Sequence, residues 1–388
     1  MRVRRCKVLY LEPRQEIEFD LEDLLAGGDG AKRQQRWVAL APHTAREHVV
    51  DALSREVLGG LGSEQWVEQV ALPESWRSAL PALLNAGLVV SDAPEHAGHR
   101  ESDESLRATH WHPLSALLHG MTRWSDVDSV EAMRKAGTET AEQLRDVLGP
   151  PPPERTCHPG STALISLPRK PAAAFDDLLR RRTTCRNFDR SRPLPLDMTA
   201  QLLERVFSAQ AAVRVAEDTV FLKKSSPSGG GLHPIEAYLV VRDVDGLEPG
   251  LYHYDFLDHA LHRLPDPDLP VQELMLRAVA GQQWFADAHA MAIMAPRYAR
   301  NFWKYRQHAK AYRAVLLEAG HLSQTLYLSA TEAGLAAYVT CAINEVCLDE
   351  AFGLDPMGEG VLAVCGFGWR AERMDTMELD PLGAIWRS

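Results

Sequence analysis

Residues 301–338 read NFWKYRQHAKAYRAVLLEAGHLSQTLYLSATEAGLAAY. Apolar and aromatic residues recur here with the period of an α-helix, which predicts one long helix with a single buried stripe. The stripe comprises Tyr305, Ala309, Tyr312, Leu316, Ala319, Leu322, Leu326 and Ala330. Polar side chains share the same turns, namely Lys304, Arg313, Glu318, His321 and Gln324. Burying so many polar groups lowers stability unless they bind one another or a ligand, so the helix either is an internally paired core helix or holds a cofactor.

A second segment, residues 223–241, reads KKSSPSGGGLHPIEAYLVV and joins a glycine loop to a predicted strand. Glycine allows positive φ and lets the backbone come close to a flat ligand. The loop is not a dinucleotide fingerprint, because no strand runs directly into GxGxxG with a helix behind it. Taken alone, it is equally well explained as a turn.

A third segment, residues 178–189, reads LLRRRTTCRNFD and is strongly basic. Guanidinium groups bind oxyanions in a bidentate manner, and neighbouring hydroxyls satisfy the remaining acceptors. The arginines are Arg180, Arg181, Arg182 and Arg186, and the hydroxyls belong to Thr183 and Thr184. This segment is therefore either a site for a phosphate or an anionic ring, or a solvated basic helix end.

Together and in this order, the segments resemble the nitroreductase-like FMN enzymes, specifically the SagB-type (McbC-like thiazole/oxazole oxidase) branch that matures ribosomal peptides. Five ordered elements over about residues 170–375 carry the resemblance. They are an RRSxRxF-like motif at 182–188, a PSxGxLxPxExY motif at 227–238, GLYHY at 250–254, the Lys304-Tyr305, Tyr312-Arg313 and Gly320-His321 helix with Gln324, and a glycine-rich strand at 361–368.

The resemblance implies an α+β fold with a mainly antiparallel central sheet flanked by helices, and FMN at the interface of a homodimer. It assigns the phosphate and pyrimidine oxygens of FMN to the basic segment, and the isoalloxazine ring to the glycine loop and the closing strand. The implied cofactor-binding residues are Arg182, Thr184, Arg186, Pro227, Ser228, Gly229, Gly230, Gln324, Gly366 and Gly368.

The implied reaction is oxidation of azoline rings to azoles, or of another peptide Cα–Cβ bond, with hydride transfer to the flavin and reoxidation by oxygen. A base must take the second proton, and the family's Lys-Tyr pair corresponds to Lys304 and Tyr305. We expect this pair to be buried and mutually coupled, and either residue is the base. His321 is expected to pack or to form hydrogen bonds rather than to transfer protons.

The sequence also departs from the family pattern. Thr183 stands where the family often has a second arginine, and Thr325 replaces the usual asparagine after Gln324. The spacing between Lys304-Tyr305 and Tyr312-Arg313 is looser than in the common form. FMN binding is still expected despite these departures, but they leave the substrate undetermined.

Residues 1–95 are predicted to form a winged-helix-like domain. Strand-like runs at 7–11, 16–19 and 37–40 precede a capping box, Thr44 with Glu47, which predicts a helix through Val49, Leu53 and Val57. A second helix is expected at 75–85, followed by a wing strand at 88–90. In peptide-maturing enzymes such a unit recognises a leader peptide, which adds a strand to an exposed edge. A capping or dimer-stabilising domain is the alternative.

Residues 92–104 are acidic and are predicted to be a linker. The segment 96–150 as a whole is predicted to contain this acidic linker and the connecting helices that follow it. Gly149 and the prolines at 150–153 mark the boundary, because four consecutive prolines exclude a helix or a central strand. Residues 151–388 would form the FMN domain. His110, His112 and His119 fit no standard metal-site spacing, so no metal site is predicted.

Composition narrows the class of protein. The 388 residues, 45% of them hydrophobic, suffice for one large and one smaller domain. The net charge of -11 argues against nucleic acid as a partner. Six cysteines, including Cys157, form no CxxC pair, so neither zinc nor a disulfide framework is indicated. Without an 18-residue apolar run or a signal peptide, the chain is expected to be cytoplasmic, with no membrane partner.

The expected partners are a precursor peptide, a cyclodehydratase complex and a second copy of the chain. Two other functions remain open. An NAD(P)H-dependent nitroreductase or flavin reductase acting on small molecules would share the FMN motifs. A non-catalytic leader-binding subunit of a maturation complex would need broken flavin motifs, and here they are largely intact.

Overall fold

The computed structural model describes residues 1–156 and 158–386, so Cys157 lies outside the described residues. The chain forms two compact units. The first comprises Met1–Arg123, Arg297–Val315 and Leu354–Gly360, and the second contains the rest of the chain. The expected domain ranges, 1–95, 96–150 and 151–388, remain predictions.

The second unit is built on a six-stranded antiparallel sheet in the order β11-β10-β9-β12-β14-β13. Its central strands read as continuous apolar runs, because both faces of the sheet are covered. The strands are β9 (Ile235–Val241), β10 (Gly250–Asp255), β11 (Ala260–Arg263), β12 (Ala290–Pro296), β13 (Ala336–Thr340) and β14 (Ala363–Gly368). Every residue of β12 and β14 is buried.

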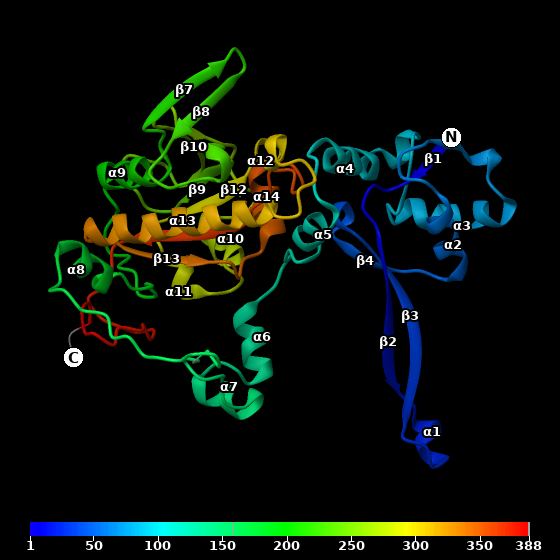
Figure 1. The fold of residues 1–388 in the computed structure, drawn as a ribbon, viewed down its shortest axis with the longest axis horizontal. Coiled ribbons are helices and arrows are strands. Elements are labelled where there is room, and N and C mark those ends of the chain that lie inside the picture. Colours follow the sequence, from blue (N-terminus) through cyan, green and yellow to red (C-terminus); the bar gives the residue numbers. More distant parts are fainter. Residues whose placement is uncertain (157, 387–388) are drawn as a thin grey trace. The chain divides into compact units, whose positions relative to one another are not determined.

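Helices accompany this sheet in the same unit (Figure 1). They are α6 (Ser129–Ala136), α7 (Ala141–Leu148), α8 (Ala174–Arg181), α9 (Leu196–Phe207), α10 (Val271–Ala278), α11 (Gln283–Ala286), most of α13 (Ala311–Glu332) and α14 (Glu345–Phe352). The expectation of a mainly antiparallel sheet flanked by helices is confirmed.

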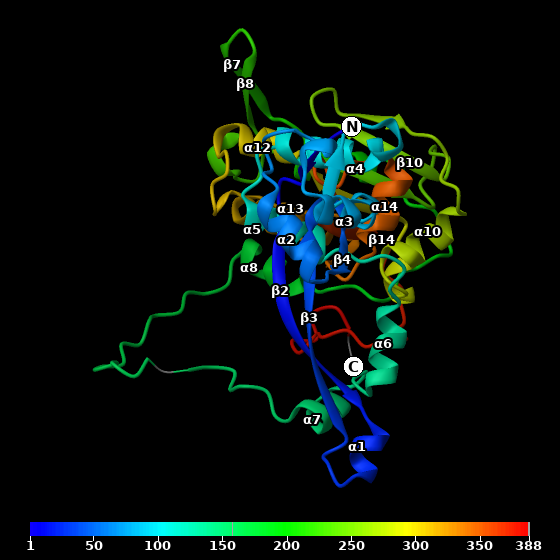
Figure 2. The same ribbon diagram turned by 90° about the vertical axis from the view of Figure 1, so that its right-hand side faces the viewer.

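Two parts of the second unit stand away from the sheet. The hairpin of β7 (Ala211–Ala216) and β8 (Thr219–Lys223) projects outward in both ribbon views (Figures 1 and 2). The proline-rich boundary begins a long exposed connection between α7 and α8, and residues 149–156 and 158–173 form no helix or strand (Figure 2).

The predicted single helix over 301–338 is wrong in its extent. The structure has α12 (Tyr298–Lys304), a break, α13 and then β13. Tyr305 leaves helical geometry with ψ 50°, and Gln307 has φ 49°, a left-handed conformation that cannot continue a helix. Beyond the break the stripe behaves as predicted from Ala319 onward, whereas Leu316 stays 43% exposed.

The first unit has its own hydrophobic core. Val3, Leu58 and Leu80 are fully buried there, with Trp37 and Trp76 packed at the margin. Its elements are β1 (Arg2–Arg5), β2 (Tyr10–Phe19), α1 (Leu21–Leu25), β3 (Ala31–Ala41), β4 (Arg46–Val49), α2 (Ala52–Gly60), β5 (Val67–Glu68), α3 (Glu74–Asn85), β6 (Val89–Ser91), α4 (Ala97–Ala108), α5 (Pro113–Met121) and α12. Two small antiparallel sheets, β5-β1-β6 and β2-β3-β4, organise it.

Two local predictions in this unit are wrong. Thr44 ends a 3₁₀ turn and Glu47 lies in β4, so they form no capping box; Glu47 pairs with Arg14 instead. Helix α2 starts later, where the Asp51 carboxylate accepts the Ser54 N–H at 2.7 Å. The acidic stretch read as a linker is largely helix α4, because Asp103 is buried and paired with Arg107 at 2.7 Å. Helix α3 and strand β6 agree with the predicted ranges.

No helix within residues 1–156 and 158–386 is long and apolar enough to span a membrane.

Candidate functional site

One face of α13 contacts the glycine loop. The Ser228 hydroxyl donates to the Glu318 carboxyl group, one turn on His321 Nδ1 donates to the Pro227 carbonyl at 3.3 Å, and the next turn places Thr325 Oγ1 2.9 Å from Ser226 Oγ. Positions 318, 321 and 325 share a face because residues three and four apart are neighbours on a helix. Helix α13 therefore fixes the loop at three points.

Another face of α13, that of Tyr327, contacts the basic segment. The Tyr327 hydroxyl accepts the Val339 N–H at 3.0 Å and lies 3.0 Å from Thr184 Oγ1. The Arg182 guanidinium lies over the Tyr327 ring, 5.3 Å from its centroid. Gln324, one turn before Tyr327, is exposed. Helix α13 thus contacts the glycine loop and the basic segment on different faces, and it also carries Gln324; all three are predicted to bind the cofactor.

Arg182 is suited to an anion. Its side chain is half-buried, and no carboxylate of the described residues forms an ion pair with it. A cation held over an aromatic ring is positioned without being neutralised. Arg182 and the Thr184 hydroxyl therefore offer the donors that a phosphate needs, and the residues present fit that part of FMN.

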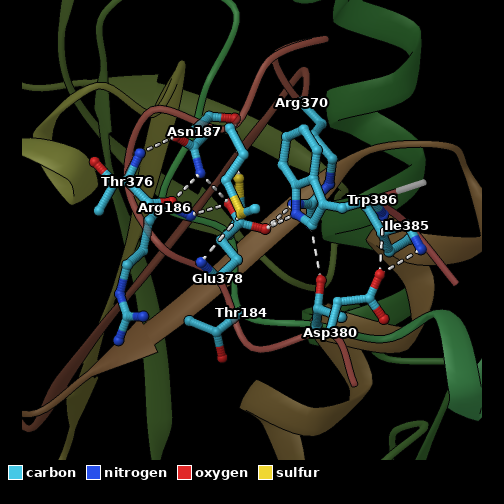
Figure 3. Close-up of polar contacts among 12 residues, drawn as sticks. Thr184, Arg186, Asn187, Arg370, Thr376, Glu378, Asp380, Ile385 and Trp386 are labelled. Carbon is cyan, nitrogen blue, oxygen red and sulfur yellow. Dashed lines mark hydrogen bonds and ion pairs between the residues drawn. The ribbon is translucent and has the colours of Figure 1, made fainter. Parts of the chain in front are cut away.

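Arg186 has a different environment, shown in Figure 3. Its backbone N–H donates to Glu378 Oε1 at 2.6 Å, and its Nη1 donates to the Met377 carbonyl at 2.9 Å. The motif is thus tied to the C-terminal segment, residues 370–386. FMN contact by Arg186 stays a prediction.

Glu378 is the centre of this C-terminal network (Figure 3). The carboxylate is buried and also accepts from Asn187 Nδ2 at 2.8 Å, from Trp386 Nε1 at 2.9 Å and from Arg370. Burial alone would raise the pKa of Glu378, but the donors outweigh it and the pKa is lowered. Sequence reasoning missed this residue, because it lies in no motif and its partners Arg186 and Asn187 are distant along the chain.

Asn187 completes the link between the basic segment and the C-terminal segment. Its Oδ1 accepts the N–H groups of Asp375 at 2.8 Å and Thr376 at 2.7 Å, while its Nδ2 also donates to the Thr376 carbonyl. Arg370 Nη2 donates to Thr183 Oγ1 at 3.1 Å. Thr183 and Asn187 therefore hold the basic segment against the C-terminal segment.

The glycine loop has a backbone that most residues cannot adopt. Gly230 and Gly231 have φ of 67° and 69°, and His233 has φ of 47°. Ser228 Oγ closes the turn by accepting the His233 N–H at 2.9 Å. With Pro227 and Gly230 exposed, the loop presents backbone rather than side chains, as a surface for a flat ring requires.

Glu318 is the most strongly perturbed acid of this region. Its side chain is 3% exposed, and burial raises its pKa to about 7, against the lowering effects of the Ser228 hydroxyl, Lys224 and the Ile235 N–H. Perturbed carboxyl groups in such surroundings are frequent at functional sites. The sequence showed Glu318 as one polar residue on a helix, but not that it would be buried against the loop.

Gly366 and Gly368 have a packing reason to be glycine. A Cβ at Gly366 would lie 2.1 Å from Cε1 of Tyr338, and one at Gly368 would lie 2.2 Å from Nδ1 of His289. Both positions are buried in β14. Their role in the flavin wall stays a prediction.

Lys304 and Tyr305 lie in the first unit, at the end of α12. The Lys304 Nζ is 5.6 Å from the centroid of the Tyr305 ring. Lys304 is exposed and Tyr305 half-buried, so the expected burial of the pair is wrong. Tyr305 ends α12 and so lies outside α13, which carries most of the buried stripe to which the single-helix prediction had assigned it.

His119 belongs to an aromatic cluster of the first unit. Its ring stacks on Trp111 with centroids 5.3 Å apart, and its Nε2 donates to the Pro356 carbonyl at 2.9 Å. Nδ1 is then the acceptor for the Tyr312 hydroxyl, 3.2 Å away. Burial lowers the pKa of His119 to about 3. Among the residues described, no group of three histidine, cysteine or acidic side chains is placed to hold a metal ion.

Comparison with known proteins places residues 179–369 in the nitroreductase family. A nitroreductase-family protein of Methanocaldococcus jannaschii, MJ1384, is 35% identical over 176 residues, which cover 45% of this chain and 82% of that protein.

Two relatives process peptides. The trifolitoxin-processing protein TfxB of Rhizobium leguminosarum bv. trifolii is 28% identical over 44% of this chain and 47% of its own. The microcin B17-processing protein McbC of Escherichia coli is 27% identical over 47% of this chain and 65% of its own. The chain thus matches less than two thirds of either relative.

A solved structure of the E. coli microcin synthetase McbBCD complex with truncated pro-MccB17 bound shares the fold. The TM-score is 0.51 at 20% identity, with 69% of this chain and 94% of that chain covered.

Proposed function

Because the chain belongs to the nitroreductase family, we propose that it is an FMN-dependent dehydrogenase of a ribosomally synthesised precursor peptide. Nitroreductase-family proteins generally bind flavin, and the similarity to TfxB and McbC supports a peptide as the substrate. The observation that carries the cofactor assignment is that Arg182, which has no carboxylate partner among the described residues, and the Thr184 hydroxyl both contact Tyr327 of α13 and offer donors to a phosphate.

The residues of this chain divide the binding of FMN between them. Arg182 and Thr184 supply donors to the phosphate, with Arg186 and Gln324 as further polar contacts. The backbone of Pro227, Ser228, Gly229 and Gly230 would contact the ring, together with Gly366 and Gly368. FMN, when bound, would supply the two-electron chemistry of the reaction, with oxygen as the proposed final electron acceptor.

The proposed reaction oxidises an azoline ring to an azole, or another peptide Cα–Cβ bond. One carbon loses a hydride and its neighbour loses a proton, which a base must accept. One of Lys304 and Tyr305 is the proposed catalytic base. The Lys304 side chain is exposed, which leaves it accessible to a peptide.

Residues 1–95 are proposed to bind the leader segment of the precursor, and a cyclodehydratase complex is the proposed supplier of the azoline. In the nitroreductase fold FMN lies at the interface of two such units, so a homodimer is also proposed.

Purified protein tests this function directly. Bound FMN absorbance near 450 nm is expected, together with peptide oxidation that consumes oxygen and not NAD(P)H. Protein that binds no flavin would instead be a non-catalytic leader-binding partner. The 35% identity to MJ1384 favours a second candidate, an NAD(P)H-dependent nitroreductase, which flavin-containing protein that oxidises NAD(P)H without any peptide would support.

A further inference from the structure

Glu318 is a buried acid that the proposed reaction does not use. It lies on the face of α13 that contacts the glycine loop, and its carboxyl group accepts the Ser228 hydroxyl proton. Ser228 Oγ in turn accepts the His233 N–H at 2.9 Å. The carboxyl group is therefore joined by one hydroxyl to the backbone expected to support the flavin ring.

The groups facing Glu318 come from several elements. Ser228 and His233 belong to the loop, and His233 Nδ1 is 3.9 Å from Glu318 Oε1. The Ile235 N–H at the start of β9 and Lys224 after β8 also favour the ionised form. Against these, burial favours the neutral form, and the resulting pKa of about 7 leaves both forms accessible near neutral pH.

We propose that Glu318 holds a proton for the flavin: its carboxylate takes up one proton from water when the ring gains two electrons, and releases it on reoxidation. Negative charge that arrives beside the loop disfavours a second negative charge nearby, so reduction raises the proton affinity of the carboxylate. Ser228 is the positioning residue that connects the two. This inference rests on the proposed FMN function.

The test is the midpoint potential of bound FMN, measured by spectroelectrochemical titration from pH 6 to pH 9. Wild type and Glu318→Gln are expected to coincide at pH 6, where Glu318 is neutral. Above pH 7 the wild-type potential is expected to be lower by about 30 mV for each tenfold rise in proton affinity on reduction, the value for a two-electron couple.

Ser228→Ala provides a second readout, because it keeps Glu318 and removes a donor to its ionised form. In this variant, the pH at which the midpoint potential falls below that of Glu318→Gln should therefore be higher than in wild type. Glu332→Gln is the matched control: Glu332 lies on the same helix but is exposed and paired with Arg205, so its potentials should overlay those of wild type.

The outcomes are distinct. Parallel potentials for wild type and Glu318→Gln across the whole range overturn the proposal, as does an unmoved pH profile in Ser228→Ala. If Glu318→Gln fails to fold, the test is whether the pH dependence of the midpoint potential in Ser228→Ala is shifted to higher pH relative to wild type. Failure of every protein, wild type included, to bind FMN overturns the proposed function instead.

Discussion

Arg182 and Arg186 are four residues apart but have different environments, and this difference leads to the first prediction. Arg182 lies over Tyr327 without a carboxylate partner among the described residues, whereas Arg186 Nη1 donates to the Met377 carbonyl. Arg182→Ala should lose a charge-assisted contact to phosphate worth about 1.5 to 3 kcal/mol, at least a tenfold loss in FMN affinity. Fluorescence titration of the apoprotein with FMN measures it.

The control is Arg181→Ala at the exposed neighbouring position, which should bind FMN as wild type does. Arg186→Ala should also purify with less flavin if this side chain contacts FMN. Equal affinity in Arg182→Ala and wild type would remove Arg182 from the site.

Lys304 and Tyr305 give the second prediction at this scale. Tyr305→Phe deletes only the hydroxyl, and Lys304→Met deletes only the charge, so both variants should fold and keep FMN. At least one should slow anaerobic flavin reduction by peptide about a hundred- to ten-thousandfold, the usual contribution of a positioned acid or base. Wild-type reduction rates in both variants would assign the base elsewhere.

At the scale of elements, Glu378 fastens the C-terminal segment to the basic segment. Glu378→Ala leaves the Arg186 N–H, Asn187 and the Arg370 guanidinium without their acceptor. Breaking a buried ion pair by removing one partner costs about 3 to 5 kcal/mol, so the free energy of unfolding should fall by about that much. Chemical denaturation measures the loss.

Asp375→Asn is the matched control, because the Asp375 side chain is exposed and its pair with Arg373 is a surface pair. Its effect should stay below about 1 kcal/mol. Similar losses in the two variants would contradict a special role for the Glu378 network.

Helix α5 carries a pH-sensitive residue of the first unit, His119. The pKa of His119 is lowered to about 3, so the folded state resists protonation more than the unfolded chain does. The stability that this contributes is present above pH 6.5 and is lost as the pH falls. Between pH 6.5 and 5 the loss from this one group should be about 2 kcal/mol.

His119→Gln should show a flatter dependence over that interval, although its stability at pH 7 will be lower. Denaturation curves of both proteins at pH 7 and pH 5 test this. An equal slope in the variant would mean that other groups carry the acid sensitivity.

For the whole molecule we predict a homodimer in which each copy helps to enclose the other's FMN. Light scattering should give about twice the mass of 43.1 kDa, and dilution to the monomer should release the flavin. A monomer that keeps its full complement of FMN would contradict the prediction.

The sequence by itself identified the family through its ordered motifs, and the family implied the antiparallel sheet, because motif order and glycine positions are local properties of the chain. It named Arg182, Thr184 and the loop at 227–230 as cofactor-binding groups; all of them contact α13, and their role in binding FMN stays a prediction. It failed at the break after Lys304, where the Gln307 N–H donates to the distant His110 carbonyl at 3.0 Å, and before Asp51, where residues 46–49 pair with β3 instead of starting the helix.

Only the tertiary structure decided which polar groups are buried and which groups form hydrogen bonds or ion pairs with them. The raised pKa of Glu318 depends on its burial against the loop that contains Ser228, 90 residues away along the chain. The lowered pKa of Glu378 depends on donors such as the Arg186 N–H, 192 residues away. The pKa of a carboxyl group is set by desolvation and by neighbours in space, and neither can be read from spacing in the sequence.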